Sequence, residues 1–563
     1  MQNEKEKVQI GNIISKLRRA SGYTQEEICR GICSISEFDK IELNLRIPGY
    51  FELDRFFSRM GKSTESLEYI LSKETYELYE LRYCIQKSIC QREFEKAMKL
   101  LRKYQKKKYA DRPLHCQYIE QELAQIYWMT HESLEKVQEC LNKAIQQTLR
   151  EKDILSMEAA IGIEELQLLL FQIEISLQKE NEKCVSLKKI LIYIERHITD
   201  INEKVKVYPY AVILLVEYSN IELEYSYLMY ILETALELFR DTGGILYLSE
   251  TIQKYIGLLQ RNRGREEKIE RFRKMRNILR KVEGDCGIYL EKYRLFQSYN
   301  REFELDYELL RRTRIALKMS QEEVCEGICE QETLSRIENG KRKPHRKTIQ
   351  ELLERVDQKR NLVETVIMTE DYEVLELKQT YENWKIRNDK EKIQEISGLL
   401  RKNINYDEAT EKYIIKMKVV EAYEEGKLSA EVAIDKLLEL VPKAFFDKKF
   451  IQQCKLTATE ANILNEIALL YQRLSQYEKA DEIYKKVLRY YEGESIRFVF
   501  HAQQWKIHLL NYAKNLEQMG KLKEVTDISR ELIAKMLETG KTVGVEKSME
   551  LIEHAQIDFE KAI

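Results

Sequence analysis

The sequence is poor in residues that interrupt helices: it has five prolines and twenty glycines among 563 residues. Alternation of apolar and polar residues, which is the pattern of a half-buried strand, is hard to find. Apolar residues instead recur at helical spacing along nearly the whole chain. The predicted fold class is therefore all-α.

Long apolar runs are also missing. No run approaches the roughly 20 apolar residues that span a bilayer, and the charged stretch 1–7 lacks the apolar core of a signal peptide. Apolar residues make up 44% and charged residues 33% of the chain, which is typical of a folded, soluble protein. We expect a cytoplasmic protein of about three to five domains, with no membrane partner.

The chain has almost no excess of charge of either sign. Its formal net charge is −2 at pH 7, so the chain as a whole has no attraction for nucleic acid. DNA binding would have to depend on local basic patches. One basic run, between residues 261 and 281, is interpreted as a solvated helix face.

No catalytic or metal-binding signature stands out. The sequence has no glycine-rich phosphate loop, and its seven histidines show no ligand spacing. Eleven cysteines, scattered along the chain, fit a reducing compartment better than a disulfide framework. Two pairs spaced four apart, Cys29/Cys33 and Cys325/Cys329, suggest a metal site, but packing is favoured because neither pair has further ligands. We expect no enzymatic activity, no metal and no cofactor.

One stretch of the sequence occurs twice. In the first copy Thr24 can cap a short helix, and Glu27 three residues later completes a capping box. Gly31 then breaks this helix, and a second short helix is predicted over residues 34–43. The second copy repeats the pattern with Ser320, Glu323, Gly327 and a second helix over residues 330–339. A helix, a tight glycine turn and a helix predict a helix-turn-helix, whose second helix can enter a DNA major groove.

The residues of this motif carry a resemblance to a known family. The second copy reads Leu-Ser-Arg-Ile-Glu-Asn-Gly-Lys-Arg-Lys-Pro over residues 334–344, which resembles the Cro/C1-type (XRE) helix-turn-helix signature. The Gly-Ile-Cys-Ser stretch over residues 31–34 resembles the Rgg/PlcR/PrgX group of peptide-pheromone regulators. The resemblance implies a DNA-binding domain that is joined to tetratricopeptide-like helical repeats, as in quorum-sensing regulators.

The resemblance also implies which residues contact DNA. Bases are read from the first turn of the second helix, and the glutamine that opens the first helix touches phosphate. The implied contacts are Gln25, Ser34, Ser36, Glu37 and Lys40 in the first copy, and Gln321, Gln331, Glu332, Thr333 and Arg336 in the second. Two basic clusters flank the second copy where phosphates would lie, namely Arg311, Arg312 and Arg314, and Lys341, Arg342 and Lys343. The first copy has acidic residues at 37 and 39 and lacks the basic turn, and the second has Glu330 and Glu332. A degenerate domain used only for packing is therefore the alternative for each copy.

Helical hairpins account for the rest of the chain. The clearest runs from Leu464 to Leu488, where the small residues Ala468 and Ala480 let two helices approach closely. A hairpin of this kind cannot bury its apolar face alone and has to stack on neighbours. The predicted domains are 1–62 (helix-turn-helix), 66–300 (helical repeats), 303–362 (helix-turn-helix) and 363–563 (helical repeats).

A constant offset relates the two halves. Ser320 corresponds to Thr24 at 320 − 24 = 296 residues, and the pairs Tyr76/Tyr372 and Tyr127/Tyr423 show the same offset. We interpret this as a tandem duplication of one helix-turn-helix domain with its repeats.

The inner face of the second repeat stack is a candidate peptide site. On a tetratricopeptide register its polar residues are Asn462, Asn465, Gln472 and Arg473. In the pheromone regulators, asparagines there pair with the backbone of an extended peptide. Solvated or inter-hairpin polar residues are the alternative interpretation.

The predicted function is a sequence-specific, DNA-binding transcriptional regulator that is gated by a short peptide. One chain with two reader domains would act as a covalent pseudo-dimer on a non-palindromic operator. Its partners would be double-stranded DNA, a short signalling peptide and, as a further candidate, a second copy of the chain. The alternative is a protein-interaction scaffold whose helix-turn-helix domains no longer bind DNA.

Overall fold

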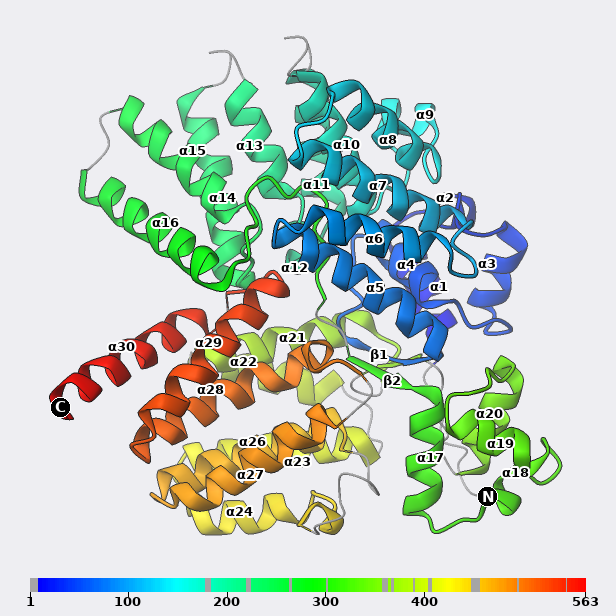
Figure 1. The fold of residues 1–563 in the computed structure, drawn as a ribbon, viewed down its shortest axis with the longest axis vertical. Coiled ribbons are helices and arrows are strands. Elements are labelled where there is room, and N and C mark those ends of the chain that lie inside the picture. Colours follow the sequence, from blue (N-terminus) through cyan, green and yellow to red (C-terminus); the bar gives the residue numbers. More distant parts are fainter. Residues whose placement is uncertain are drawn as a thin grey trace.

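The structure of the protein is a computed structural model. It describes residues 9–177, 184–218, 224–262, 266–299, 302–356, 363–365, 369–387, 390–403, 408–446, 456–493, 496–542 and 544–562. Helices predominate in these ranges (Figure 1). None of the helices described there combines the length and the apolar character that a membrane crossing requires.

Residues 10–59 form a compact group of helices, here called unit 1. Its helices are α1 (Ile10–Ala20), α2 (Gln25–Cys29), α3 (Ile35–Glu42) and α4 (Tyr50–Arg59). The predicted capping box at the start of α2 is present, because Thr24 accepts from Glu27 N and the Glu27 side chain accepts from Thr24 N. Ile28, Phe38 and Phe56 lie in its core without exposed surface.

Residues 306–355 form unit 2, which has the same arrangement of helices. These are α17 (Asp306–Ala316), α18 (Gln321–Cys325), α19 (Gln331–Glu338) and α20 (Arg346–Arg355). The four helices begin and end 296 residues after their counterparts, from 306 − 10 = 296 to 355 − 59 = 296. Unit 2 has an apolar cluster of its own, in which Val324, Leu334, Ile337 and Leu352 have no exposed surface.

A small β-sheet links the two units, and the all-α prediction missed it. Its strands are β1 (Leu67–Leu71), β2 (Glu302–Leu305) and β3 (Val363–Thr365), in the order β2-β1-β3. The β1 strand is parallel to β2 and antiparallel to β3, with Glu68 opposite Glu364. The side chains of β1 alternate between buried and half-buried, but five residues are too few for this pattern to stand out among helices.

Repeat domain 1 follows unit 1 and forms the upper part of the molecule in Figure 1. Its helices are α5 (Lys73–Cys90), α6 (Phe94–Gln105), α7 (Pro113–Met129), α8 (Leu134–Gln146), α9 (Glu151–Ser156), α10 (Ile163–Leu177), α11 (Cys184–His197), α12 (Ile201–Lys204), α13 (Tyr208–Tyr218), α14 (Tyr225–Thr242), α15 (Leu248–Arg261) and α16 (Glu266–Cys286). Consecutive helices pack on one another, as α7 does on α8. A continuous apolar core runs through the stack.

Repeat domain 2 follows unit 2 and lies below repeat domain 1 in Figure 1. Its elements are α21 (Tyr372–Arg387), α22 (Lys390–Asn403), α23 (Glu408–Glu424), α24 (Ala430–Leu438), η1 (Lys443–Phe446), α26 (Ala458–Arg473), α27 (Tyr477–Glu492), η2 (Phe498–His501), α28 (Ala502–Gln518), α29 (Leu522–Glu538) and α30 (Val545–Ala562). The hairpin predicted around Ala468 and Ala480 is α26–α27, and both alanines are fully buried.

The two repeat domains touch through segments that are also related by the offset. Gly244 forms an antiparallel bridge with Lys541. Beside this bridge, Ile245 N donates to Gly540 O at 3.2 Å and Thr542 N donates to Gly243 O at 2.7 Å. Gly540 is the counterpart of Gly244, since 540 − 244 = 296.

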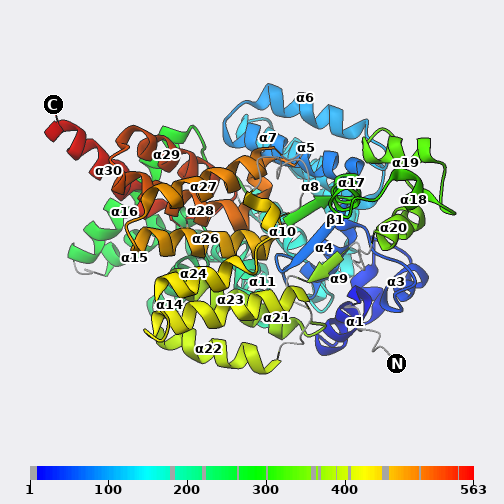
Figure 2. The same ribbon diagram turned by 90° about the horizontal axis from the view of Figure 1, so that it is seen from below.

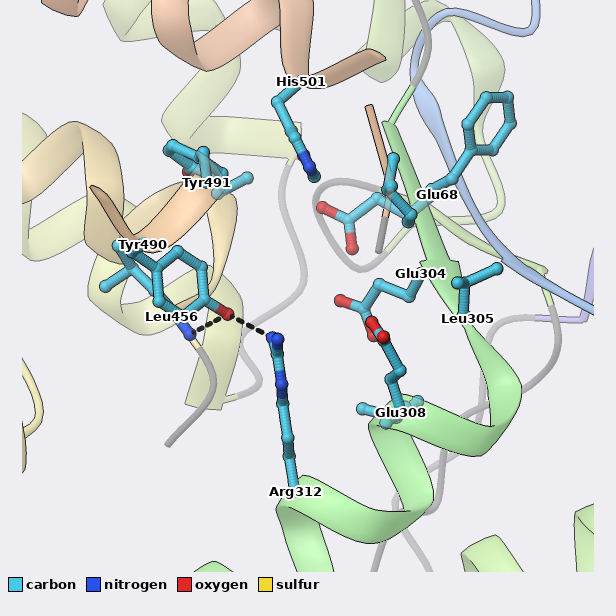
Figure 3. A pocket seen from close by; sticks show the side chains of 13 residues that line it. Glu68, Glu304, Leu305, Glu308, Arg312, Leu456, Tyr490, Tyr491 and His501 are labelled. Carbon is cyan, nitrogen blue, oxygen red and sulfur yellow. Dashed lines mark hydrogen bonds between the residues drawn. The ribbon is translucent and has the colours of Figure 1, made fainter. Parts of the chain in front are cut away.

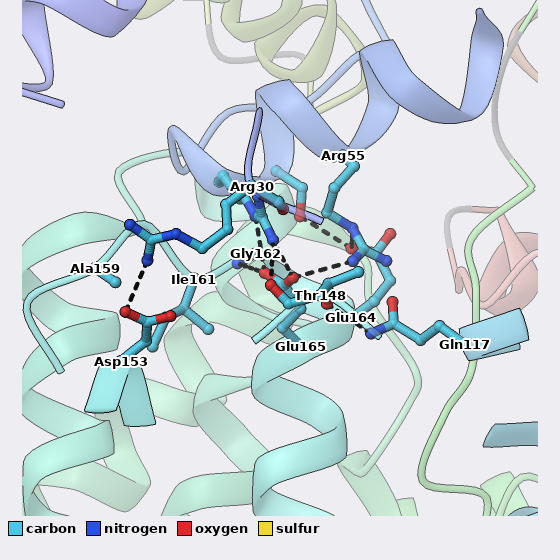
Figure 4. A network of polar contacts seen from close by, with 12 residues as sticks. Arg30, Arg55, Gln117, Thr148, Asp153, Ala159, Ile161, Gly162, Glu164 and Glu165 are labelled. Carbon is cyan, nitrogen blue, oxygen red and sulfur yellow. Dashed lines mark hydrogen bonds and ion pairs between the residues drawn. The ribbon is translucent and has the colours of Figure 1, made fainter. Parts of the chain in front are cut away.

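Unit 1 is firmly docked on repeat domain 1 (Figure 4). Arg30 Nη1 lies 2.7 Å from Asp153 Oδ1, and Tyr23 Oη lies 2.9 Å from His197 Nδ1. At Gly31, which has φ +70°, a Cβ atom would lie 2.7 Å from the backbone of Thr148. The turn of unit 1 is therefore pressed directly against the repeats.

Among the residues that the structure describes, fewer polar contacts join unit 2 to the rest of the molecule than join unit 1. Lys343 Nζ lies 3.3 Å from a Glu74 carboxylate oxygen, and Lys73 Nζ donates to Gly340 O at 3.3 Å. At Gly327, which has φ +72°, a Cβ atom would meet nothing within 4 Å. Both units lie at the same end of the molecule in the two views of the ribbon (Figures 1 and 2).

This difference predicts unequal effects of the same substitution at the two turn glycines. Gly327→Ala should destabilise the protein by about 1–2 kcal/mol, because only the left-handed backbone is unfavourable there. Gly31→Ala should destabilise it by about 1–3 kcal/mol more, because the added methyl group also overlaps the backbone of Thr148. Urea denaturation of the two variants measures both effects. Equal losses would contradict the docking of the unit 1 turn.

Candidate nucleic-acid interface

The α18–α19 pair of unit 2 is fixed by local signals. Ser320 Oγ accepts from Glu323 N at 3.2 Å, and the Glu323 carboxylate accepts from Ser320 N at 2.6 Å, which starts α18. Gly327 provides the left-handed turn between the helices. Leu334 and Ile337 bury one side of α19, so its opposite side faces outward.

A buried carboxylate locks the first three helices of unit 2 together. Glu338 accepts from Arg314 Nε at 2.6 Å, from Arg314 Nη2 at 3.0 Å and from Gln321 Nε2 at 2.7 Å. Arg314 and Gln321 were predicted to contact DNA, but the structure places their side chains in this internal network. Unit 1 has the same network, in which Glu42 accepts from Arg18 at 2.7 Å and from Gln25 at 2.7 Å.

The outward side of α19 carries the predicted base-reading residues. Gln331, Glu332 and Arg336 are exposed, and Thr333 is half-buried. Arg336 Nη2 lies 2.6 Å from Glu332 Oε1, one helical turn earlier, so this carboxylate now holds the guanidinium. Asn339 continues this face and is also exposed. It was not predicted, although its position three residues after Arg336 on a helix could have indicated it.

The turn after α19 adds positive charge to the same surface. Lys341, Arg342 and Lys343 are all exposed. Arg342 Nη1 donates to Thr333 Oγ1 at 2.8 Å, which ties this turn to α19. The predicted cluster at Lys341–Lys343 therefore lies next to the predicted base-reading residues. We call Gln331, Arg336, Asn339, Lys341, Arg342 and Lys343 the α19 surface.

The other predicted basic cluster is divided by the structure. Arg311 on α17 is exposed. Arg312 points away from the α19 surface toward repeat domain 2, where its Nη1 atom lies 3.0 Å from Tyr490 Oη. Figure 3 shows Arg312 in a pocket between α17, the sheet and repeat domain 2, which is also lined by Glu304 and Glu308. Arg312 is thus a contact between unit 2 and the repeats.

Unit 1 presents a different surface on α3. Ser34 and Glu37 form a capping box, and hydrogen bonds from Ser34 lower the pKa of Glu37. Ser36 and Lys40 are exposed. Three aliphatic side chains are also exposed: Ile35 (48%), Leu43 (60%) and Leu45 (75%). At the corresponding positions, 296 residues later, the α19 surface has the polar residues Gln331, Asn339 and Lys341. Ile35 opens α3, and Leu43 and Leu45 lie in the turn after it. A contiguous apolar patch of such side chains is typical of a protein-binding surface.

The predicted peptide-binding residues of α26 fall into two groups. Asn465 Oδ1 accepts from Asn511 Nδ2 at 3.1 Å, and Gln472 Nε2 donates to Asn511 O at 3.0 Å. These two side chains therefore make inter-helix contacts, which is the alternative that the sequence left open. Asn462 is half-buried, and Arg473 is exposed with its guanidinium 5.0 Å from the centre of the Tyr423 ring.

The described residues contain no group of three or more His, Cys, Asp or Glu side chains arranged to hold a metal ion. Cys29 and Cys325 are buried in the cores of their units, and Cys33 and Cys329 are half-buried beside them. Both cysteine pairs lie within the units and not on the α19 surface.

Comparison with known proteins identifies one of the two units. A family described as helix-turn-helix matches residues 310–357, so the chain contains a helix-turn-helix domain in unit 2. No curated protein sequence matches the chain. A solved structure, "Crystal Structure of Bacillus thuringiensis PlcR in complex with the peptide PapR7 and DNA", is similar to 48% of this chain and 94% of that chain, at 17% identity and a TM-score of 0.30.

Proposed function

We propose that this protein is a sequence-specific, DNA-binding transcriptional regulator. The observation that carries the proposal is the α19 surface of the matched helix-turn-helix domain, which is exposed, basic and mounted on a helix fixed by Glu338. Arg336 can make paired hydrogen bonds to guanine, and Gln331 to adenine, whereas Lys341 and Arg342 suit phosphates. A selection from random DNA should return an enriched sequence, and a selection that enriches none would remove the proposal.

We further propose that the chain is a covalent pseudo-dimer that arose by tandem duplication. In a two-fold dimer the same patch of both subunits meets itself. Two contacts here have that character: Glu68 opposite Glu364 in the sheet, and Gly244 beside Gly540 in the repeats. The symmetry is approximate elsewhere: Glu74 contacts Lys343 of unit 2, whereas its counterpart Glu370 (370 − 74 = 296) contacts Asn12 and Lys16 of unit 1.

The two units would contribute unequally to such a pseudo-dimer. Unit 2 has polar or cationic side chains where unit 1 has Ile35, Leu43 and Leu45. We therefore propose that unit 2 is the principal reader and that the operator is not a palindrome. A protein-interaction scaffold remains the second candidate function, and the exposed aliphatic side chains of α3 and of the turn after it are the observation that favours it. Salt-dependent retention on a DNA resin favours the regulator, and elution independent of salt favours the scaffold.

Gating by a peptide is the finer part of the proposal. A peptide that binds one arrangement of the repeats more tightly than another shifts the population between them. Repeat domain 2 contacts unit 2 through Tyr490 and Arg312, so a shift in its helices can reach the reader. Asn462 and Arg473 of α26 remain the candidate ligand contacts. A peptide that binds the chain without changing its affinity for DNA would contradict gating.

The role of Arg336 can be tested against its counterpart in unit 1. Arg336→Ala should weaken binding to the selected DNA by about 1–3 kcal/mol and relax the base preference at one position. Lys40→Ala is the matched control, since 336 − 40 = 296, and should have less effect. Fluorescence anisotropy with the selected site and with single-base variants measures both quantities. Unchanged affinity and preference in Arg336→Ala would mean that α19 is not the recognition helix.

A further inference from the structure

An extended segment of the chain lies inside repeat domain 1. Residues 288–299 connect α16 to β2, and Figure 1 shows them as the green trace that crosses the helices of repeat domain 1. They form neither a helix nor a strand. Tyr293, Leu295, Phe296 and Tyr299 of this segment are at most 4% exposed. The segment, which follows the last helix of repeat domain 1, is therefore buried along most of its length, and Tyr299 also lies near Phe500 of repeat domain 2.

Glutamine side chains of repeat domain 1 hold the backbone of the segment. Gln125 Oε1 accepts from Arg294 N at 2.7 Å, and Gln125 Nε2 donates to Lys292 O at 3.1 Å. Gln86 does the same for one residue, because it accepts from Gln297 N at 2.7 Å and donates to Gln297 O at 2.9 Å. A carboxamide that offers both a donor and an acceptor recognises a peptide backbone irrespective of the side chains it carries.

One side chain of the segment is recognised in detail. Arg294 donates to Glu174 at 2.8 and 3.0 Å and to both Glu250 oxygens at 3.0 Å. Its guanidinium lies 5.1 Å from the centre of the Tyr210 ring, and Tyr247 Oη donates to Arg294 O at 2.9 Å. A planar guanidinium fits such paired carboxylates and aromatic faces, whereas a lysine ammonium does not fit them equally well.

The Arg294 pocket is assembled from separate helices. Glu174 belongs to α10, Tyr210 to α13 and Glu250 to α15. Two carboxylates at most 16% exposed would repel each other without a cation between them. The helices of repeat domain 1 thus form a pocket that requires a guanidinium group from elsewhere.

We propose that the inner face of repeat domain 1 is a binding groove for an extended, arginine-containing peptide, and that residues 288–299 fill it as a tethered ligand. The hydrogen bonds from Gln86 and Gln125 to the peptide backbone give affinity, and the Arg294 pocket gives specificity, as in other extended-peptide sites. Repeat domain 2 lacks this pair of glutamines, because Glu382 and Glu421 stand at the positions of Gln86 and Gln125. The inference does not depend on DNA binding.

A free copy of the segment provides the test. The probe is a labelled peptide with the sequence of residues 288–299, blocked at both ends. In the native chain the tethered segment competes at an effective concentration on the order of millimolar. Arg294→Ala in the full chain weakens this competitor, so we expect the probe to bind the variant at least tenfold more tightly than the native chain. A probe with citrulline in place of its arginine keeps the shape without the charge and should lose at least tenfold in affinity for the variant.

A second variant keeps the test informative if Arg294→Ala does not fold. Arg294→Lys keeps a cation between the carboxylates, and it should also bind the probe more tightly than the native chain, by a smaller factor. If neither variant gains affinity for the probe, or if the citrulline probe binds as well as the arginine probe, the segment is only a linker and the proposal fails. DNA binding is measured separately on the same proteins, so a chain that binds the probe but no DNA would contradict the proposed function alone.

Discussion

Replacing Arg59 with methionine is expected to lower the free energy of unfolding by about 3–5 kcal/mol, the usual loss when one partner of a buried ion pair is removed. Arg59 is 1% exposed, and its Nη2 atom lies 2.6 Å from Glu165 Oε1, on a carboxylate with no exposed surface. The guanidinium also donates to Ile28 O at 2.9 Å, Arg30 O at 2.7 Å and Thr148 O at 3.1 Å. Methionine fills the volume but removes this donor from the three carbonyl oxygens and leaves Glu165 with Arg55 as its cation.

The matched control is the equivalent residue of unit 2. Arg355 follows Arg59 by 355 − 59 = 296 residues, is exposed and makes one hydrogen bond, to Glu323 O at 3.3 Å. Arg355→Met should change the stability by no more than about 0.5 kcal/mol, as is usual for surface positions. Thermal denaturation of the two variants and the native chain measures the difference. A similar loss in both would mean that Arg59 does not hold unit 1 on the repeats.

Acid should reduce the difference between the native chain and Arg59→Met. Burial raises the pKa of Glu165, but Arg59 and Arg55 more than offset this and lower the pKa to about 2. An unfolded glutamate has a pKa of about 4.3. The ionised carboxylate therefore stabilises the native chain above roughly pH 5, and this contribution is lost as the pH falls toward 2. The stability gap between the two proteins should narrow over the same range, because a protonated Glu165 no longer requires a cation.

The local parts of this structure could be predicted from the sequence. The second helices of the two copies were predicted over 34–43 and 330–339, and α3 and α19 span 35–42 and 331–338. Caps and glycine turns act within a few residues, so their signals are visible in the chain itself. The same holds for the buried alanines of α26–α27. Gln321 and Arg314 show the limit, because Glu338, which holds their side chains, lies on a different helix.

Long-range packing could not be predicted in this way. Nothing near Arg59 in the sequence indicates Glu165, which lies on α10, and nothing near Arg294 indicates the carboxylates of α10 and α15. The sheet depends on Glu68 meeting Glu364, which follows it by 364 − 68 = 296 residues, with repeat domain 1 and unit 2 between them. Periodicity shows which face of a helix is buried, but it does not show which distant element covers that face. The difference between a docked unit 1 and a less enclosed unit 2 follows from such contacts alone.

Removing the three cations of the turn after α19 should have the largest effect on DNA binding. The triple variant Lys341→Ala, Arg342→Ala and Lys343→Ala is expected to bind the selected DNA roughly a hundredfold more weakly near 0.15 M salt. Each lost phosphate contact should reduce the slope of log affinity against log salt by about 0.9, so three contacts reduce it by about 2.7. Titrations at four salt concentrations determine both quantities.

A control with the same change of charge separates local contact from overall charge. Arg271, Lys274 and Lys281 are exposed on α16, which lies at the opposite end of the molecule from unit 2 in Figure 1. Replacing these three by alanine also takes the net charge from −2 to −5, by loss of three cations. Since exposed charges beyond a Debye length of about 8 Å are largely screened, this variant should keep the native slope and affinity. If both triple variants lose affinity equally, the DNA contact is not the α19 surface. If only the first does, the phosphates lie against the turn after α19, whose cluster of cations unit 1 lacks.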